Sequence, residues 1–135
     1  MLAAAAALAA CQTGGGGATI ADVATLDDRA RQFVQDAAIA SFYTSRCAEQ
    51  GIGLREGSDR ALVEDFIRRM QAAGYSLETI NAAIGRLDPE LGGRAAVAYL
   101  EARGLSAGQP NAAFCDAART EIAEGTSVGL MLESA

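Results

Sequence analysis

The 135-residue chain contains no histidine, no tryptophan and only two prolines, and its 11 basic residues are all arginines because lysine is also absent. These absences exclude imidazole bases, histidine metal ligands, Schiff-base lysines and the lysine of a phosphate-binding loop. No Gly-x-Ser-x-Gly motif occurs either. We therefore assign no catalytic, cofactor-binding or metal-binding residue, and we expect the protein not to be an enzyme.

Positive charge and aromatic side chains are also scarce. The formal net charge is −6, which argues against binding to the phosphate backbone of nucleic acids. Aromatic residues make up 5% of the chain, whereas alanine occurs 31 times. An alanine-rich, proline-poor composition favours helices that pack closely through small side chains. We expect an all-α fold, a small single-domain bundle of about five helices stapled by one disulfide.

Residues 1–10 have the features of a lipoprotein signal peptide. The uncharged stretch from Leu2 to Ala10 would rise only about 14 Å as a helix, too little to span a bilayer. Leu8-Ala9-Ala10-Cys11 resembles a bacterial lipobox, in which Cys11 is lipidated and becomes the first residue after cleavage. Signal peptides normally begin with Lys or Arg, so we expect the true start to lie upstream of Met1. The alternatives are ordinary cleavage after Ala7-Leu8-Ala9, which leaves Cys11 as a free thiol, and an alanine-rich tail with an incidental cysteine.

Residues 11–25 are expected to form a flexible tether, and residues 26–135 the helical domain. Gly14 to Gly17 are four successive glycines, which have no side chains to bury and maximal backbone entropy. Gln12, rather than Asp, after the lipidated cysteine resembles the enterobacterial pattern for delivery to the outer membrane. We therefore expect a lipid anchor in the cell envelope, in the outer membrane rather than the inner, with the domain in the periplasm.

Apolar residues at three- and four-residue steps, with signals at each end, predict five helices. They run from a cap at Thr25 to Gly51 and Gly53, from Ser58 to Gly74, from Ser76 through Ile84, from Asp88-Pro89 to Gly104, and from Pro110-Asn111 to Gly125. No stretch alternates with a period of two, so no strand is expected. The apolar tail from Val128 to Leu132 is expected to dock on the bundle.

Neighbouring carboxylates are interpreted as helix starts and not as catalytic pairs. Asp27 with Asp28, and Asp88 with Glu90, are expected at helix N-termini, where the helix dipole favours negative charge. Arg119 is expected to form a structural ion pair with a neighbouring helix rather than to bind a substrate.

Cys47 and Cys115 are expected to form a disulfide. An exported chain meets an oxidising compartment, and lipidation of Cys11 leaves an even number of cysteines. A bridge across 68 residues would stabilise the fold by about 4 kcal/mol through loop closure. The alternative is a pair of buried core thiols, favoured if the chain stays in the cytosol. Two distant cysteines without histidine make a poor metal site.

The segment from about Leu26 to Leu132 resembles a family of short, exported, functionally uncharacterised proteins of alphaproteobacteria. The resemblance rests on Cys47, Ala98-Tyr99-Leu100, Arg103-Gly104, Asn111-Ala112-Ala113-Phe114-Cys115, Arg119-x-Glu121-Ile122-Ala123-x-Gly125-Thr126 and Val128-Gly129. The sequence departs from the family at Leu130, where an arginine is expected. The resemblance implies export, helices and a Cys47–Cys115 bridge, and it supplies no activity.

The expected function is a lipid-anchored structural or protein-interaction module of the cell envelope. Such a module would expose an apolar patch of several hundred Å² to an envelope protein partner. The alternative is a periplasmic small-ligand carrier, which would need an enclosed apolar pocket of roughly 300 Å³ or more. A chaperone-like binding protein is a further alternative, by architectural analogy with small acidic periplasmic chaperones. Neither a cofactor nor a nucleic-acid partner is expected.

Lipidation of Cys11 is directly testable in protein isolated from its native membranes. Mass spectrometry of the N-terminal peptide is expected to find acyl groups on Cys11, because lipobox processing attaches them there. A Cys11→Ser variant is expected to leave the membrane fraction. A mature protein with an unmodified Cys11 thiol would defeat the anchor hypothesis.

Overall fold

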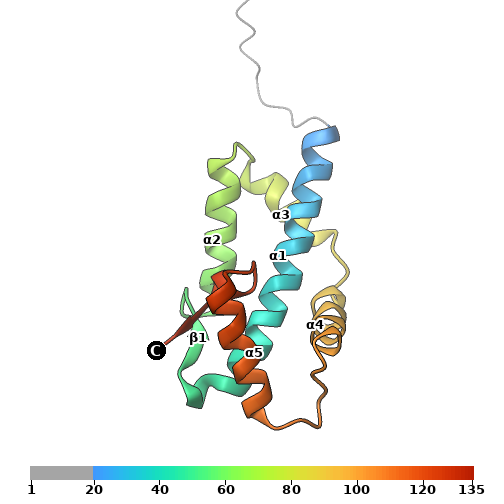
Figure 1. Ribbon diagram of the computed structural model, residues 1–135. Coiled ribbons are helices and arrows are strands. Elements are labelled where there is room, and N and C mark those ends of the chain that lie inside the picture. The colour runs from blue at the N-terminus through green and yellow to red at the C-terminus, as the bar shows by residue number, and fades with distance from the viewer. Residues whose placement is uncertain (1–19) are drawn as a thin grey trace, which may run out of the picture.

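The computed structural model describes residues 20–135, with side chains from residue 25 onward, so the predicted lipobox with Cys11 and the glycine tether lie outside the described residues. The helices are α1 (Ile20–Cys47), α2 (Asp59–Ala72), α3 (Leu77–Gly85), α4 (Leu91–Ala102) and α5 (Asn111–Glu124). The shorter elements are the 3₁₀ helices η1 (Ala48–Gln50) and η2 (Gly129–Met131) and the strands β1 (Ile52–Leu54) and β2 (Leu132–Ser134). The predicted all-α bundle of five helices is confirmed (Figure 1).

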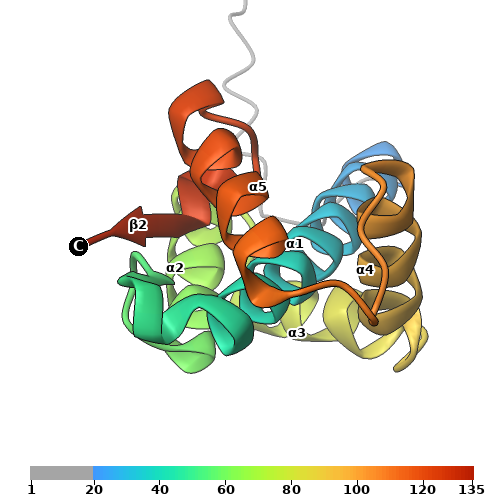
Figure 2. The ribbon, with the colours of Figure 1, turned by 60° about the horizontal axis from the view of Figure 1, so that its bottom comes forward.

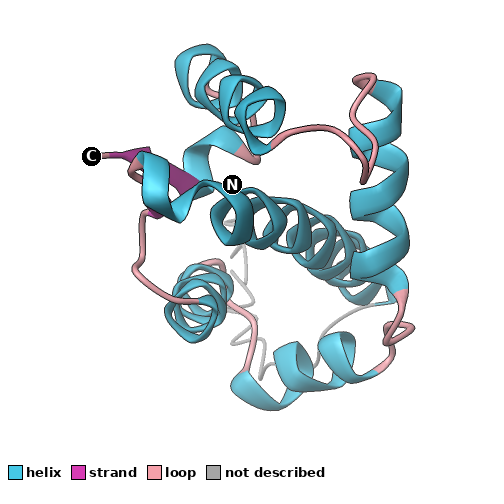
Figure 3. Ribbon diagram, turned by 90° about the horizontal axis from the view of Figure 1, so that it is seen from below, coloured by secondary structure: helices cyan, strands magenta, loops and turns pink. Residues whose placement is uncertain are grey.

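Helix α1 forms the axis of the bundle. Its 28 residues rise roughly 42 Å, and each of the other four helices packs against it. Seen from below, α1 lies at the centre and α2, α3, α4 and α5 surround it (Figure 3). None of the helices in residues 20–135 is both long enough and apolar enough to span a membrane.

The core is divided into two clusters along α1. The first joins the N-terminal half of α1 to α2 and α3, through Leu26, Ala30, Phe33, Leu62, Phe66, Met70, Ile80 and Ala83. The second joins its C-terminal half to α4, α5 and the C-terminal segment, and includes Ile39, Tyr43, Leu100, Phe114, Val128 and Leu132. Leu54 and Met131 pack against both clusters. The predicted docking of the apolar tail is therefore confirmed.

The predicted helix ends are confirmed where a side chain or a glycine fixes them locally. Ser58 and Ser76 cap α2 and α3, because each hydroxyl oxygen accepts a backbone N–H three residues later, at 3.2 and 3.1 Å. Helix α5 ends at Gly125, whose φ of +64° lies in the left-handed region. Each of these signals lies within a single helical turn of sequence, so it can be recognised without knowledge of the rest of the fold.

The predicted start of the first helix at Thr25 is wrong, since α1 begins at Ile20. The preceding residues include no glycine or proline after Gly17, so nothing in their backbone opposes a helix. Residues 20–25, assigned to the tether, therefore belong to the helix. Asp27 and Asp28 consequently lie inside α1 instead of at its start, where they pair with Arg86 of the neighbouring segment and with Arg31.

Two further local predictions are corrected by the ion pairs. Helix α4 begins at Leu91, because the Asp88 carboxylate accepts the Glu90 backbone N–H and forms a turn ahead of the helix. Arg94 then binds both acids. On α2, a spacing of four residues predicts ion pairs from Glu64 to Arg68 and from Asp65 to Arg69. Asp65 does pair with Arg69, whereas Glu64 binds Arg60.

The prediction that the chain contains no strand is also wrong. Strands β1 and β2 pair antiparallel, with Ile52 opposite Ser134 and Leu54 opposite Leu132. β2 runs out to the C-terminus beside β1 (Figure 2). Each strand has only three residues, too few to show alternation, and their partners lie far apart in sequence.

The predicted disulfide between Cys47 and Cys115 is present. It joins the last residue of α1 to the second turn of α5, and both cysteines are fully buried. The guanidinium of Arg46 lies beside it, over the rings of Phe42 and Phe114 at 5.1 and 4.3 Å. A covalent bond and cation–π contacts thus hold the two helices together at this end of the bundle.

Removal of the disulfide is expected to lower the free energy of unfolding. The Cys47→Ala, Cys115→Ala double variant should lose about 4 kcal/mol, because the unfolded chain regains the entropy of a 68-residue loop. Urea denaturation followed by circular dichroism measures this difference. Cys11→Ala is the control, and equal stabilities of the two variants would contradict the prediction.

Candidate functional site

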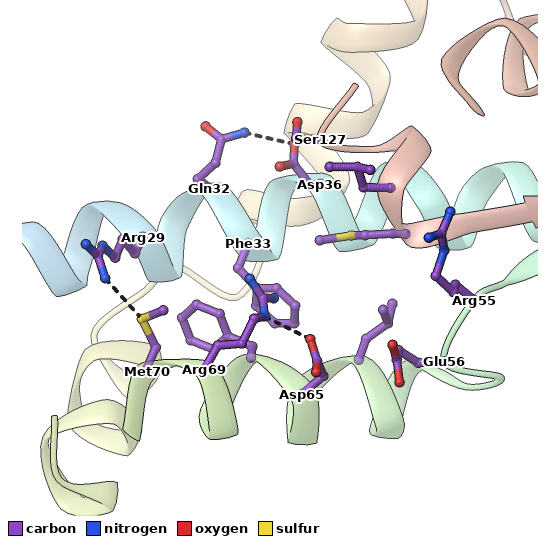
Figure 4. Close-up of a pocket in the computed structure, with 14 residues that line it drawn as sticks. Arg29, Gln32, Phe33, Asp36, Arg55, Glu56, Asp65, Arg69, Met70 and Ser127 are labelled. Atoms are coloured by element: carbon purple, nitrogen blue, oxygen red, sulfur yellow. Dashed lines mark hydrogen bonds and ion pairs between the residues drawn. The ribbon is translucent and has the colours of Figure 1, made fainter. Parts of the chain in front are cut away.

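A pocket of about 460 Å³ lies between α1 and α2 and is closed on one side by the segment around η2 (Figure 4). Its apolar lining consists of Phe33, Leu62, Phe66, Met70, Leu130 and Met131. Phe33 and Phe66 stack face to face, with ring centroids 4.4 Å apart and planes inclined by 13°. Because these two rings belong to the first core cluster, the pocket has a rigid apolar floor.

The rim of the pocket is charged and only partly neutralised. Arg69 of α2 binds Asp65 at 2.8 Å. Arg29 of α1 instead reaches the sulfur of Met70 at 4.0 Å, and Arg55 reaches the carbonyl oxygen of Leu132 at 3.4 Å. Neither Arg29 nor Arg55 forms an ion pair in the described part of the chain.

Asp36 is the buried charge of the pocket. It lines the cavity from α1, and only 5% of its surface is exposed. One carboxylate oxygen accepts a hydrogen bond of 2.8 Å from the Gln32 side chain. Within residues 20–135 no arginine pairs with it. A buried carboxylate without a cationic partner costs free energy that the fold must supply from elsewhere.

A second buried carboxylate, Glu121 of α5, is fully compensated. One of its oxygens accepts the Tyr99 hydroxyl at 2.6 Å and forms an ion pair with the Arg103 guanidinium at 2.9 Å, and the other accepts the Thr126 hydroxyl. Arg103 also lies 3.3 Å from the centre of the Tyr99 ring. These four residues, which we call the Glu121 network, join α4 to α5 and to the C-terminal segment. All four belong to the motifs on which the family resemblance rests.

The Glu121 network positions the wall of the pocket. The Thr126 hydroxyl also accepts the backbone N–H of Gly129 at 3.0 Å, which fixes the start of η2. Gly129 lies so close to α5 that a Cβ atom there would be 1.9 Å from the Glu121 carbonyl oxygen. The following residues, Leu130 and Met131, line the pocket. The pocket wall thus depends on hydrogen bonds made on the opposite side of the C-terminal segment.

Two tyrosines near Glu121 have raised pKa values, in part because of its negative charge. Burial, together with the negative charge of Glu121, raises the pKa of Tyr43 to about 12. Burial and the hydrogen bond to Glu121 raise the pKa of Tyr99 further above its ordinary value. The Tyr43 hydroxyl is buried and has no hydrogen-bond partner among the described residues. Both tyrosines are therefore neutral at physiological pH.

The residues singled out from the sequence are only partly brought to this site. Cys11 lies outside the described residues, and Cys47 with Cys115 forms the disulfide rather than lining the pocket. Arg119 pairs with Asp116 of its own helix and donates to Gln50 of η1 at 3.2 Å, so the predicted ion pair to a neighbouring helix is a hydrogen bond. Leu130, the departure from the family pattern, lines the pocket and is 59% exposed.

Sequence reasoning missed Asp36 and Glu121. Asp36 follows Phe33 by three residues, so it continues the buried stripe of α1, and that position was the available signal. Glu121 likewise follows the buried Ala118 by three residues. In the described part of the chain, no group of three or more cysteine and acidic side chains is placed to hold a metal ion.

The sequence model of one protein family, described as a family of unknown function (DUF5333), matches residues 20–133. No curated protein and no solved structure matches the chain. The match confirms the resemblance to a family of unknown function and begins at the first residue of α1 rather than at Leu26. Export and lipid attachment stay predictions.

The substitutions Tyr43→Phe and Tyr99→Phe are expected to change the free energy of unfolding in opposite directions at pH 7. Tyr43→Phe removes a buried hydroxyl that has no partner in residues 20–135, and should raise the free energy of unfolding by up to about 1 kcal/mol. Tyr99→Phe removes a hydrogen bond to a charged group and should lower it by about 1.5–3 kcal/mol. Urea denaturation of the two matched variants measures both changes, and a larger loss in Tyr43→Phe would contradict the assignment.

The same variants predict how stability changes with pH. The pKa of Tyr43 is about 12 in the folded protein and 10.0 in the unfolded chain. The free energy of unfolding therefore does not depend on the ionisation of Tyr43 below pH 10, and it falls as the pH rises from 10 towards 12, because the unfolded chain loses the Tyr43 proton first. Tyr43→Phe should therefore lose less stability than the wild type between pH 10 and 12.

Proposed function

The chain belongs to a family of unknown function, and from this premise we propose that it is a small-ligand binding protein of the cell envelope, anchored through a lipid on Cys11. The pocket between α1 and α2 holds the ligand. The observation that carries this proposal is the volume of about 460 Å³ over an apolar aromatic floor. Ligand pockets are typically of this size, mostly apolar, with a few polar groups that fix orientation.

The distribution of exposed apolar side chains favours a ligand carrier over the protein-interaction module. The large exposed hydrophobic residues of the described chain are Val63, Leu77, Val97 and Leu130. They belong to α2, α3, α4 and η2, so each lies on a different element. Isolated exposed apolar residues are normal on a soluble surface, whereas a docking face needs a contiguous patch. Leu130 is the one that lines the pocket.

The anchor would keep this pocket near the membrane. Residues 12–19 separate Cys11 from the start of α1, and they reach at most roughly 30 Å when fully extended. Helix α1 supplies both the connection to this segment and one wall of the pocket. The sequence order therefore supports a carrier that takes up ligands close to the bilayer surface.

Binding in the pocket is testable with the apolar fluorescent probe N-phenyl-1-naphthylamine. The full chain, carrying Cys11→Ser so that it is purified without lipid, is expected to enhance the fluorescence of the probe with saturation at one site. Leu130→Trp should weaken binding at least about 10-fold, since the indole fills the pocket.

Leu77→Trp is the matched control, because Leu77 is also an exposed leucine, 47% against 59%, but lies on α3 outside the pocket. Its affinity for the probe should equal that of the parent chain. The proposal is overturned if the probe does not bind, or if the two tryptophan variants weaken its binding equally.

A further inference from the structure

We propose that the pocket binds ligands that carry a primary ammonium group on an apolar body, with the ammonium on the Asp36 carboxylate. This inference rests on the proposed function and specifies its ligand class. The two buried carboxylates of the described chain differ in one respect. Glu121 receives two hydrogen bonds and forms an ion pair with Arg103, whereas Asp36 receives one hydrogen bond, from the neutral Gln32. Asp36 therefore lacks a cationic partner that would offset the free-energy cost of burying its charge.

The arginines of the pocket do not supply this cation. Arg29 lies two helical turns from Asp36, roughly 10 Å along α1, and its guanidinium turns towards Met70. Arg55 donates to the Leu132 carbonyl oxygen, and Arg69 is held by Asp65. Figure 4 shows Asp36 between Arg29 and Arg55, with neither guanidinium directed at it.

The free oxygen of Asp36 opens onto the pocket. Among the described residues the Tyr43 hydroxyl is the only side-chain polar atom that is sealed from solvent without a partner, so the second Asp36 oxygen, which has no partner, is reached from the cavity. Figure 4 shows the Asp36 carboxylate beside Gln32 and Ser127, whereas Phe33 leaves α1 on the side that faces α2. An ammonium group there would form a charge-assisted hydrogen bond in a site largely shielded from water.

The rest of the pocket fits the apolar body of such a ligand. The apolar lining of Phe33, Phe66 and Met70 lies between α1 and α2, where an aliphatic or aromatic chain would cover it. The net charge of −6 also favours the approach of cations over anions. A carboxylate headgroup placed against Asp36 would meet the buried negative charge, so an ammonium group is favoured at this position. The pocket is therefore expected to bind apolar amines more tightly than other apolar molecules of the same length.

The test compares hexylamine, hexanol and hexanoate, which share one chain length and differ in the headgroup. Titration calorimetry of the full chain carrying Cys11→Ser is expected to find hexylamine bound at least about 10-fold more tightly than hexanol, and hexanoate most weakly. In Asp36→Asn, whose amide oxygen still accepts from Gln32, hexylamine should bind as weakly as hexanol. Affinity for hexanol should not change.

Glu78→Gln is the matched control, because it removes an equal charge from an exposed residue of α3 that lies outside the pocket. It should change the affinity for hexylamine by less than about 2-fold, since exposed charges are screened. Equal losses in Asp36→Asn and Glu78→Gln would overturn the assignment to Asp36. Equal binding of hexylamine and hexanol by the parent chain would also overturn it, and this comparison needs no variant to fold.

The two proposals fail in different ways. If N-phenyl-1-naphthylamine and hexanol bind and hexylamine gains nothing over hexanol, the ammonium site is wrong and the carrier function stands. If none of these probes binds, both proposals are wrong.

Discussion

The buried carboxylate of Glu121 is the interaction on which the C-terminal half of the fold depends. A charge buried to 3% exposure is tolerable only because Tyr99 and Thr126 donate hydrogen bonds to it and Arg103 forms an ion pair with it. Through Thr126 the same carboxylate fixes the backbone of η2, which carries Leu130 into the pocket wall. One acidic side chain therefore links helix packing, tail docking and the shape of the candidate site.

The two halves of helix α1 are held to the rest of the molecule by different kinds of contact. Around its C-terminal half lie the disulfide, the cation–π contacts of Arg46 and the Glu121 network, which are strong and directional. Around its N-terminal half, the contacts of α2 and α3 in the core are largely apolar, and here the pocket opens. The site is therefore built where apolar packing, rather than a covalent bond or charged contacts, holds the helices together.

The parts of the fold that sequence could predict are those set within a few residues. Ser58, Ser76 and Gly125 mark helix ends because a cap or a left-handed turn is decided locally. The strand pairing was missed because it joins residues far apart in the chain. The candidate site was missed for a related reason: Asp36 resembles any acidic residue on a helix until its lack of an arginine partner is seen in three dimensions.

Gly129 has a consequence for the shape of the pocket. A Cβ atom at this position would overlap the backbone of α5, so the closeness of η2 to that helix is set by a missing side chain. Leu130, one position later, lines the cavity and is 59% exposed. A different side chain at residue 130 would change the lining of the cavity and leave the backbone in place, whereas any side chain at residue 129 would displace the wall itself.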